Sequence, residues 1–112
     1  MESAYLLKFA EMDDLLSWMD MVTLVRYNFP LLESDEELEK YKQTVIKNIN
    51  RKSAICVKKD SGVVGVLIFS YKQCCLSCMA VHPEHRRNGI ASAMILEMLS
   101  VLSADKDVGL YF

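Results

Sequence analysis

Residues 81–91, Val-His-Pro-Glu-His-Arg-Arg-Asn-Gly-Ile-Ala, constrain the fold of this chain more than any other segment. They lie between an apolar run typical of a strand (residues 74–81) and a periodic run typical of a helix (residues 92–102). Backbone N–H groups at the start of a helix have no partner within the helix and attract anions. Gly89 lets the backbone approach a ligand closely, and the two arginines add positive charge. The segment therefore predicts a site for a phosphorylated ligand.

Length and composition exclude several classes of protein. The chain has 112 residues, which fits one domain spanning residues 1–112. A hydrophobic content of 52% excludes a disordered chain, and a net charge of −2 argues against a general nucleic-acid binder. The apolar runs are too short to span a bilayer, and the N-terminus lacks the basic-then-apolar order of a signal peptide. We expect a cytoplasmic protein that binds neither nucleic acids nor membranes.

Hydrophobic periodicity predicts an α/β fold with the order β-α-α-β-β-β-α-β. The expected strands are residues 4–9, 53–59, 63–71, 73–81 and 108–112. The strand at residues 63–71 is nearly all apolar, so we expect it to be buried on both faces. The sequence Asp60-Ser61-Gly62 predicts a hairpin turn before it.

Three helices are expected between these strands. Asp13 is expected to cap the first, and Ser34-x-x-Glu37 is a capping box that opens the second. The expected apolar sides are Leu15, Leu16, Met19 and Val22 in the first helix, Leu38, Tyr41, Val45 and Ile49 in the second, and Ala91, Met94, Ile95, Met98, Leu99 and Leu102 in the third.

The cysteines require an interpretation of their own. Cys75-x-x-Cys78 has the spacing of a metal or redox pair, but a strand would place these two side chains on opposite faces. Cys74 and Cys78 would instead share a face. We therefore expect no metal site, and we interpret the four cysteines as small buried apolar residues in a reducing compartment.

The run Arg86-x-x-Gly89-x-Ala91, preceded by Val81-x-Pro83, resembles the acetyl-coenzyme A signature of the Gcn5-related N-acetyltransferases, the GNAT family. Every element of that signature is present at the family's spacing, and the order of elements resembles the family from residue 5 onward. The resemblance implies a GNAT-like acyl-CoA N-acyltransferase fold. It also implies that the chain lacks the family's last helix and strands, as a C-terminally truncated member would.

The activity implied by the resemblance is transfer of an acetyl group from acetyl-CoA, as co-substrate, to an amine of a small molecule or peptide. In this family the backbone of the strand before the signature pairs with the pantetheine arm, and the loop amides hold the pyrophosphate. The matching positions, and hence the expected coenzyme contacts, are Met79, Ala80, Val81, Arg86, Arg87, Asn88, Gly89, Ile90 and Ala91.

The acid–base groups are less evident from the sequence. Glu33 is a candidate catalytic base or substrate contact, and His82, Glu84 and His85 are weaker candidates. No residue matches the tyrosine that commonly serves as the family's general acid, although Tyr111 lies in the last segment. A domain that holds coenzyme A without turnover, or is inactive, therefore stays open as the alternative function.

The last expected strand has a bearing on assembly. Residues 108–112 are apolar, and a terminal strand of that composition would leave a bare edge. Two copies of the chain could pair such edges symmetrically, so the sequence predicts a homodimer.

Overall fold

The computed structural model of the chain describes residues 5–25, 34–60 and 62–105. Its elements are β1 (Leu6–Phe9), the 3₁₀ turn η1 (Met12–Asp14), α1 (Leu15–Val25), α2 (Asp35–Asn50), β2 (Ala54–Lys59), β3 (Gly62–Ser70), β4 (Cys75–Val81), the 3₁₀ turn η4 (Pro83–His85) and α3 (Ile90–Asp105). The expected α/β order is thus confirmed as far as α3. The strand expected at residues 108–112 lies outside the described residues, so the homodimer stays a prediction.

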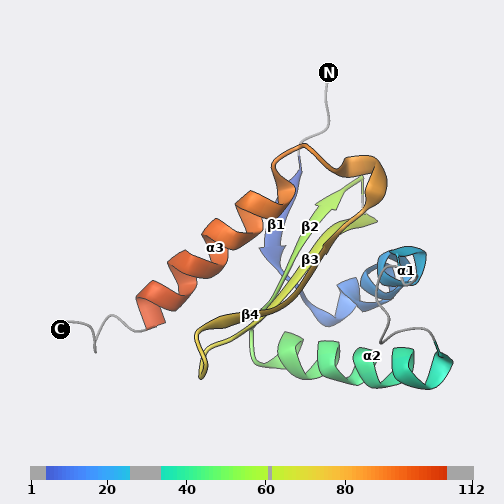
Figure 1. Cartoon of the computed structure of the whole chain (residues 1–112), viewed down its shortest axis with the longest axis horizontal. Coiled ribbons are helices and arrows are strands. Elements are labelled where there is room, and N and C mark those ends of the chain that lie inside the picture. The colour runs from blue at the N-terminus through green and yellow to red at the C-terminus, as the bar shows by residue number, and fades with distance from the viewer. Residues whose placement is uncertain (1–4, 26–33, 61, 106–112) are drawn as a thin grey trace.

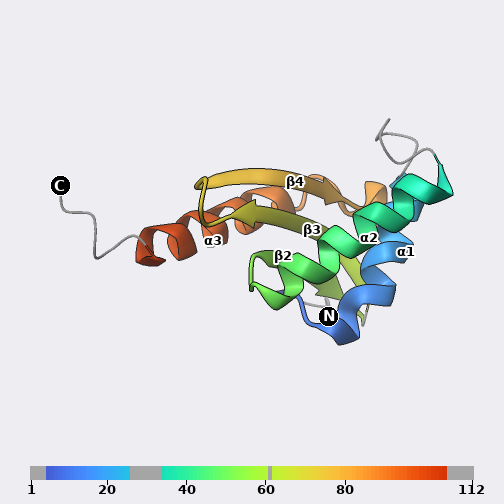
Figure 2. The ribbon, with the colours of Figure 1, turned by 90° about the horizontal axis from the view of Figure 1, so that it is seen from below.

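The four strands form one antiparallel sheet in the order β1-β2-β3-β4, with helices on both of its faces (Figures 1 and 2). On β3, Val66 and Ile68 join the core under α1 and α2, whereas Leu67 and Phe69 join the core under α3. The interior of β3 is buried throughout, which confirms the expectation drawn from its apolar sequence. β4 lies at one edge of this sheet.

The buried side of α1 differs from the expected one. Trp18 is fully buried, whereas Leu16 is 77% exposed. The buried stripe runs through Leu15, Trp18, Val22 and Val25, a spacing of three and four residues that leaves Leu16 one position outside it. Periodicity therefore gave the correct helix but placed one edge of its apolar face wrongly.

The start of α1 is fixed by Asp14, not by Asp13 as expected. Asp14 is buried, and its carboxylate accepts hydrogen bonds from Lys58 Nζ (2.7 Å), Lys8 Nζ (2.8 Å) and the Glu11 amide (2.9 Å). Burial by itself would raise the pKa of Asp14, but the hydrogen bonds from Lys58 and Lys8 outweigh it and lower the pKa to about 2. This ion-paired carboxylate joins the start of the helix to β1 and β2.

The other two helices follow the prediction closely. Ser34 caps α2, because its side chain accepts a hydrogen bond from the Glu37 amide. Met94, Met98 and Leu102 of α3 are buried as expected, but Leu99 is 52% exposed and lies outside the packed face. No helix in the described ranges is long and apolar enough to cross a membrane.

The cysteines are less buried than expected. Cys56 is buried and Cys78 is half-buried, but Cys74 and Cys75 are exposed. Cys74 lies in the turn before β4 with a φ of 53°, so the strand alternation assumed for it does not apply. Within the described residues, no group of three or more His, Cys, Asp or Glu side chains could hold a metal ion.

Candidate functional site

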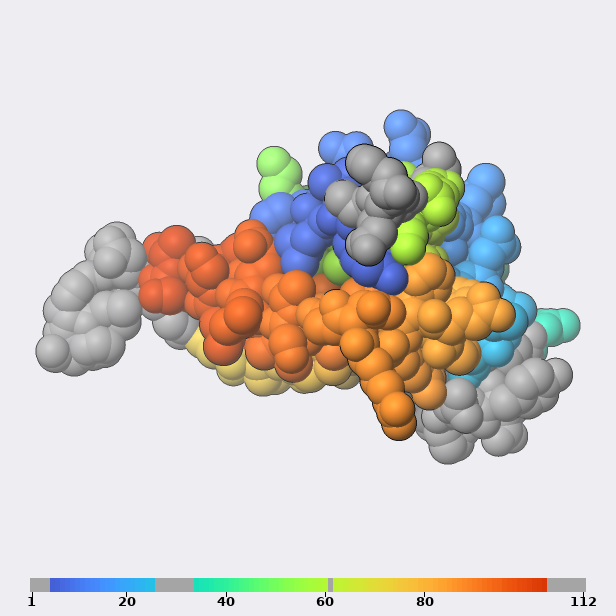
Figure 3. Space-filling view, turned by 90° about the horizontal axis from the view of Figure 1, so that it is seen from above, coloured from blue at the N-terminus to red at the C-terminus, as the bar shows by residue number. Residues whose placement is uncertain are grey.

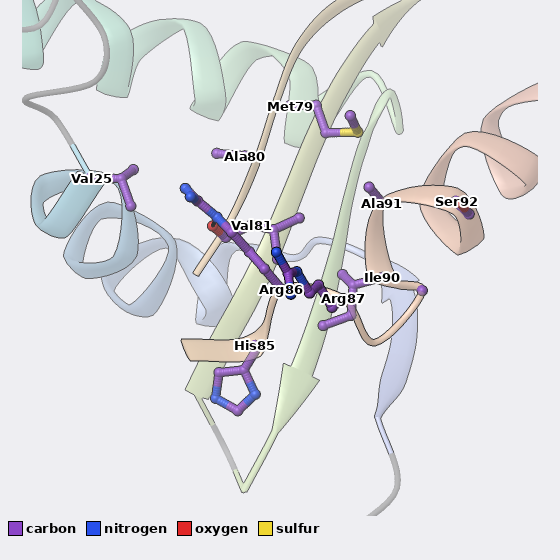
Figure 4. Close-up of a pocket in the computed structure, with 11 residues that line it drawn as sticks. Val25, Met79, Ala80, Val81, His85, Arg86, Arg87, Ile90, Ala91 and Ser92 are labelled. Carbon is purple, nitrogen blue, oxygen red and sulfur yellow. Dashed lines mark hydrogen bonds between the residues drawn. The ribbon is translucent and has the colours of Figure 1, made fainter. Parts of the chain in front are cut away.

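A cavity of about 480 Å³ lies where the end of β4 meets the start of α3 (Figure 4). Its lining residues are Val25, Met79, Ala80, Val81, His85, Arg86, Arg87, Gly89, Ile90, Ala91 and Ser92. It therefore gathers all the predicted coenzyme contacts except Asn88. Two arginines line it and none of the lining residues just named is acidic, so the cavity favours an anionic ligand.

One wall of the cavity is the outer edge of β4. The His82 amide donates a hydrogen bond to the Val64 carbonyl at 2.8 Å, and Val81 lies opposite Gly65 in the next pair. In an antiparallel sheet, hydrogen-bonded and non-hydrogen-bonded pairs alternate, so the backbone groups of Val81 point away from β3. Those of Met79 point the same way. No other strand in the described part of the chain pairs with this edge, so an extended ligand could add to it as a strand does, beside the hydrogen bond that Arg86 Nε donates to the Val81 carbonyl at 3.3 Å.

The second wall is the loop between η4 and α3. Arg87 and Gly89 both have a left-handed backbone, with φ of 70° and 75°. The Asn88 side chain donates hydrogen bonds to the carbonyls of His85 (3.0 Å) and Arg86 (3.3 Å), and these bonds fix the loop from within. Asn88 therefore shapes the cavity without lining it.

The start of α3 supplies unpaired backbone donors to the same cavity. The Ala93 amide bonds the Gly89 carbonyl at 2.9 Å and closes the first turn of the helix. The amides of Ile90, Ala91 and Ser92 precede that bond and have no partner within the helix. These three residues line the cavity, so an anion bound there would meet both the amides and the positive end of the helix dipole.

Gly65 on β3 sets how closely the start of α3 approaches the sheet. A Cβ atom at this position would lie 2.7 Å from Ile90 Cγ2 and 3.2 Å from Met94 Cε. Ile90 lines the cavity and Gly65 pairs with Val81, so this one glycine holds the two walls in register. A lone glycine inside an apolar strand is a sequence signal for such a close approach, and it could have identified this contact.

The weaker acid–base candidates differ in their surroundings. His82 Nδ1 accepts a hydrogen bond from the Glu84 amide at 3.0 Å and caps η4, so its role is local. His85 lines the cavity, and its Nδ1 lies 3.1 Å from the Tyr5 hydroxyl. Glu84 is exposed and is not among the cavity-lining residues. Glu33 and Tyr111 lie outside the described residues.

A buried polar chain ties β4 to α1 and α2. Trp18 Nε1 donates to the Tyr41 hydroxyl at 3.0 Å, and that hydroxyl lies 3.9 Å from Cys78 Sγ. Burial raises the pKa values of both Tyr41 and Cys78, so both groups are neutral at physiological pH. The chain therefore supports β4 structurally next to Met79.

Comparison with known sequences decides the family. Residues 50–111 match the family described as "Acetyltransferase (GNAT) domain", and this range contains the whole cavity-forming loop. The chain belongs to the GNAT acetyltransferase family. No curated protein sequence matches this GNAT chain significantly.

Solved structures agree with this fold. The PaiA N-acetyltransferase from Thermoplasma acidophilum, solved with coenzyme A, is 15% identical over 91% of this chain and 74% of its own, with a TM-score of 0.68. A Kribbella flavida GCN5-related N-acetyltransferase gives 0.73 at 15% identity, over 93% of this chain and 28% of its own. A GNAT-family acetyltransferase from Bacillus cereus gives 0.59 at 26% identity, over 86% of this chain and 63% of its own. The GNAT chain thus spans less than two thirds of two of these three proteins.

Proposed function

We propose that this GNAT domain binds acetyl-CoA across the free edge of β4 and transfers its acetyl group to an amine of a small molecule or peptide. The observation that carries the proposal is the single cavity that joins Met79 and Val81 to the first turn of α3. Pantetheine would pair with the outward backbone groups of β4, as an added strand does. The pyrophosphate would bind the free amides of the helix start, beside Arg87.

Transfer requires a neutral amine whose nitrogen attacks the thioester carbonyl. The C–N bond forms, the C–S bond breaks, the amine loses a proton and the thiolate gains one. A backbone N–H on the outer edge of β4 would stabilise the negative charge that develops on the carbonyl oxygen. Glu33 remains our candidate base or substrate contact, with His85 as an alternative because it lines the cavity.

A second candidate function is coenzyme binding without turnover. It is favoured by the scarcity of acid–base groups at the site: among the described lining residues there is one histidine, His85, and no Asp, Glu, Lys, Cys or Tyr, and the Nδ1 of His85 faces the Tyr5 hydroxyl. Such a domain would hold acetyl-CoA but release no thiol when amines are added.

The test is calorimetric titration with acetyl-CoA of the wild type, Gly89→Val and the control Gly62→Ala. Valine is strained at a φ of 75°, whereas a Cβ atom at Gly62 meets nothing closer than the Lys59 carbonyl at 3.8 Å. We expect saturable binding in the wild type and control that is lost in Gly89→Val. Thiol release with a panel of amines then separates turnover from binding. Absence of acetyl-CoA binding to the wild type would refute the proposal.

A further inference from the structure

Two adjacent cysteines, Cys74 and Cys75, are exposed where the turn after β3 leads into β4. Cysteine is among the residues most often buried in folded proteins, so two consecutive exposed thiols are unusual. On a regular strand these neighbours would point to opposite faces. Cys74 instead lies before β4 with a left-handed backbone, at a φ of 53°, so strand alternation does not separate the two thiols.

Both thiols face back toward the same turn. Cys74 Sγ donates a weak hydrogen bond to the Tyr71 carbonyl at 3.5 Å, and Cys75 Sγ donates one to Gln73 Oε1 at 3.8 Å. Both contacts are made by exposed side chains, and each is with an oxygen of residues 71–73. The turn therefore offers two accessible sulfur atoms together.

A ligand that takes two sulfur atoms suits this pair better than a direct disulfide does. Adjacent Cα atoms are ~3.8 Å apart, closer than the about 4.4–6.8 Å usual for a disulfide, so a direct S–S bond would be strained. A metal ion placed between the sulfur atoms lengthens the bridge and avoids that strain.

The number of available ligands decides which ion fits. Cys78 is half-buried, and its Sγ lies 3.9 Å from the Tyr41 hydroxyl, so it is not presented at the turn. Among the described residues, no third His, Cys, Asp or Glu side chain joins the pair to make a metal-binding group. Structural zinc sites need four ligands and are therefore excluded here. Copper(I) is soft, prefers thiolates and can be held by two sulfur atoms alone.

We propose that Cys74 and Cys75 form a two-thiolate site for copper(I) at the start of β4. On binding, both S–H bonds break, two Cu–S bonds form and two protons pass to solvent, while copper keeps its oxidation state. Cys75 begins β4, whereas Met79 and Val81, near the other end of the strand, line the coenzyme cavity. The copper site is thus separate from the proposed coenzyme function and does not rest on it.

The experiment is an anaerobic titration of the reduced protein with the copper(I)–bicinchoninate complex, whose visible absorbance falls as the protein removes copper. The proteins are the wild type, Cys74→Ser, Cys75→Ser and the matched control Cys78→Ser. We expect the wild type to take one copper(I) ion per chain. Each of the first two variants should bind copper(I) about 100-fold more weakly, because the loss of one thiol removes the gain from two linked ligands. Cys78→Ser should bind copper(I) as the wild type does.

Four results would overturn the proposal. The wild type might take no copper(I) from bicinchoninate, or Cys74→Ser and Cys75→Ser could both keep the wild-type affinity. An equal loss in Cys78→Ser would place the ion on a different set of thiols. Copper-dependent association in sedimentation analysis would show that each ion takes sulfur atoms from two chains. Thermal melts of every variant establish that a lost affinity does not come from a lost fold.

Discussion

Substitution of Gly65 tests whether packing beneath the site controls coenzyme binding. The added methyl group of Gly65→Ala would stand 2.7 Å from Ile90 Cγ2, closer than real Cβ contacts, so Ile90 must shift, and we expect the start of α3 to move with this buried side chain. Overpacking of this kind costs about 1–3 kcal/mol, and the reduced freedom of the unfolded chain returns about 0.4–1 kcal/mol. The net loss of about 1–2 kcal/mol corresponds to a melting point roughly 4–8 °C lower.

The effect of Gly65→Ala on acetyl-CoA binding distinguishes a change in the geometry of the site from a simple loss of stability. Ile90 leads into the free amides of the helix start, so Gly65→Ala should weaken acetyl-CoA binding although it removes no ligand contact. Calorimetry at a temperature where every variant is folded measures that effect. Gly62→Ala is the control and should be neutral or slightly stabilising, because its Cβ atom has room.

A double substitution makes the test stricter. Ile90→Ala removes the atom that the new methyl group would strike, so Gly65→Ala should cost less in that background than in the wild type. If the two substitutions are instead additive in stability, or if Gly65→Ala binds acetyl-CoA as the wild type does, then Gly65 does not hold the two walls of the cavity in register.

Three further outcomes follow from single side chains. The pKa of Asp14 is lowered from 3.8 to about 2, so the stability it contributes, on the order of 2 kcal/mol, is present above pH 4 and lost as the pH falls toward 2. Asp14→Asn should flatten this acid limb in urea titrations, and an unchanged slope would contradict the assignment. Tyr41→Phe leaves the buried Trp18 Nε1–H without its acceptor and should cost about 1–3 kcal/mol in urea unfolding, which an unchanged midpoint would rule out. Asn88→Ala removes both hydrogen bonds that fix the loop. Because the loop must then be ordered on binding, acetyl-CoA binding should weaken several-fold. The free energy of unfolding should change by no more than about 1 kcal/mol. Wild-type affinity in calorimetry would show that the loop is held by other contacts.

The sequence predicted the sheet well because its signals are local. The apolar run of β3 and the capping serine of α2 each depend on a few neighbouring residues, whereas the turn predicted before β3 contains Ser61, which lies outside the described residues. The position of the cavity was also predictable, since a strand, a polar loop and a helix start must meet at one end of the sheet. Local patterns were sufficient for these features.

The errors arose where partners are distant in sequence. The buried carboxylate of Asp14 is paired with Lys58, which lies far along the chain on β2, and nothing in the run Met12–Asp14 distinguishes Asp14 from Asp13. The exposure of Cys74 depends on where β4 begins, which the turn before it decides. The ring of His85 likewise lies against a residue distant in sequence, because its Nδ1 is 3.1 Å from the hydroxyl of Tyr5, just before β1. Such features need the tertiary arrangement.

The conformation of the loop between η4 and α3 also bears on the roles of Arg86 and Arg87. The left-handed backbone at Arg87 and Gly89, the two hydrogen bonds of Asn88 and the close approach of Ile90 to Gly65 already shape the loop without any charged contact. A non-glycine residue held at positive φ is strained, and such strain concentrates at functional sites. Since the backbone by itself presents the donors, the two arginines are free to differ in role. Arg86 rests on the β4 edge through its hydrogen bond to the Val81 carbonyl, whereas Arg87 lines the same cavity without a described contact to that edge.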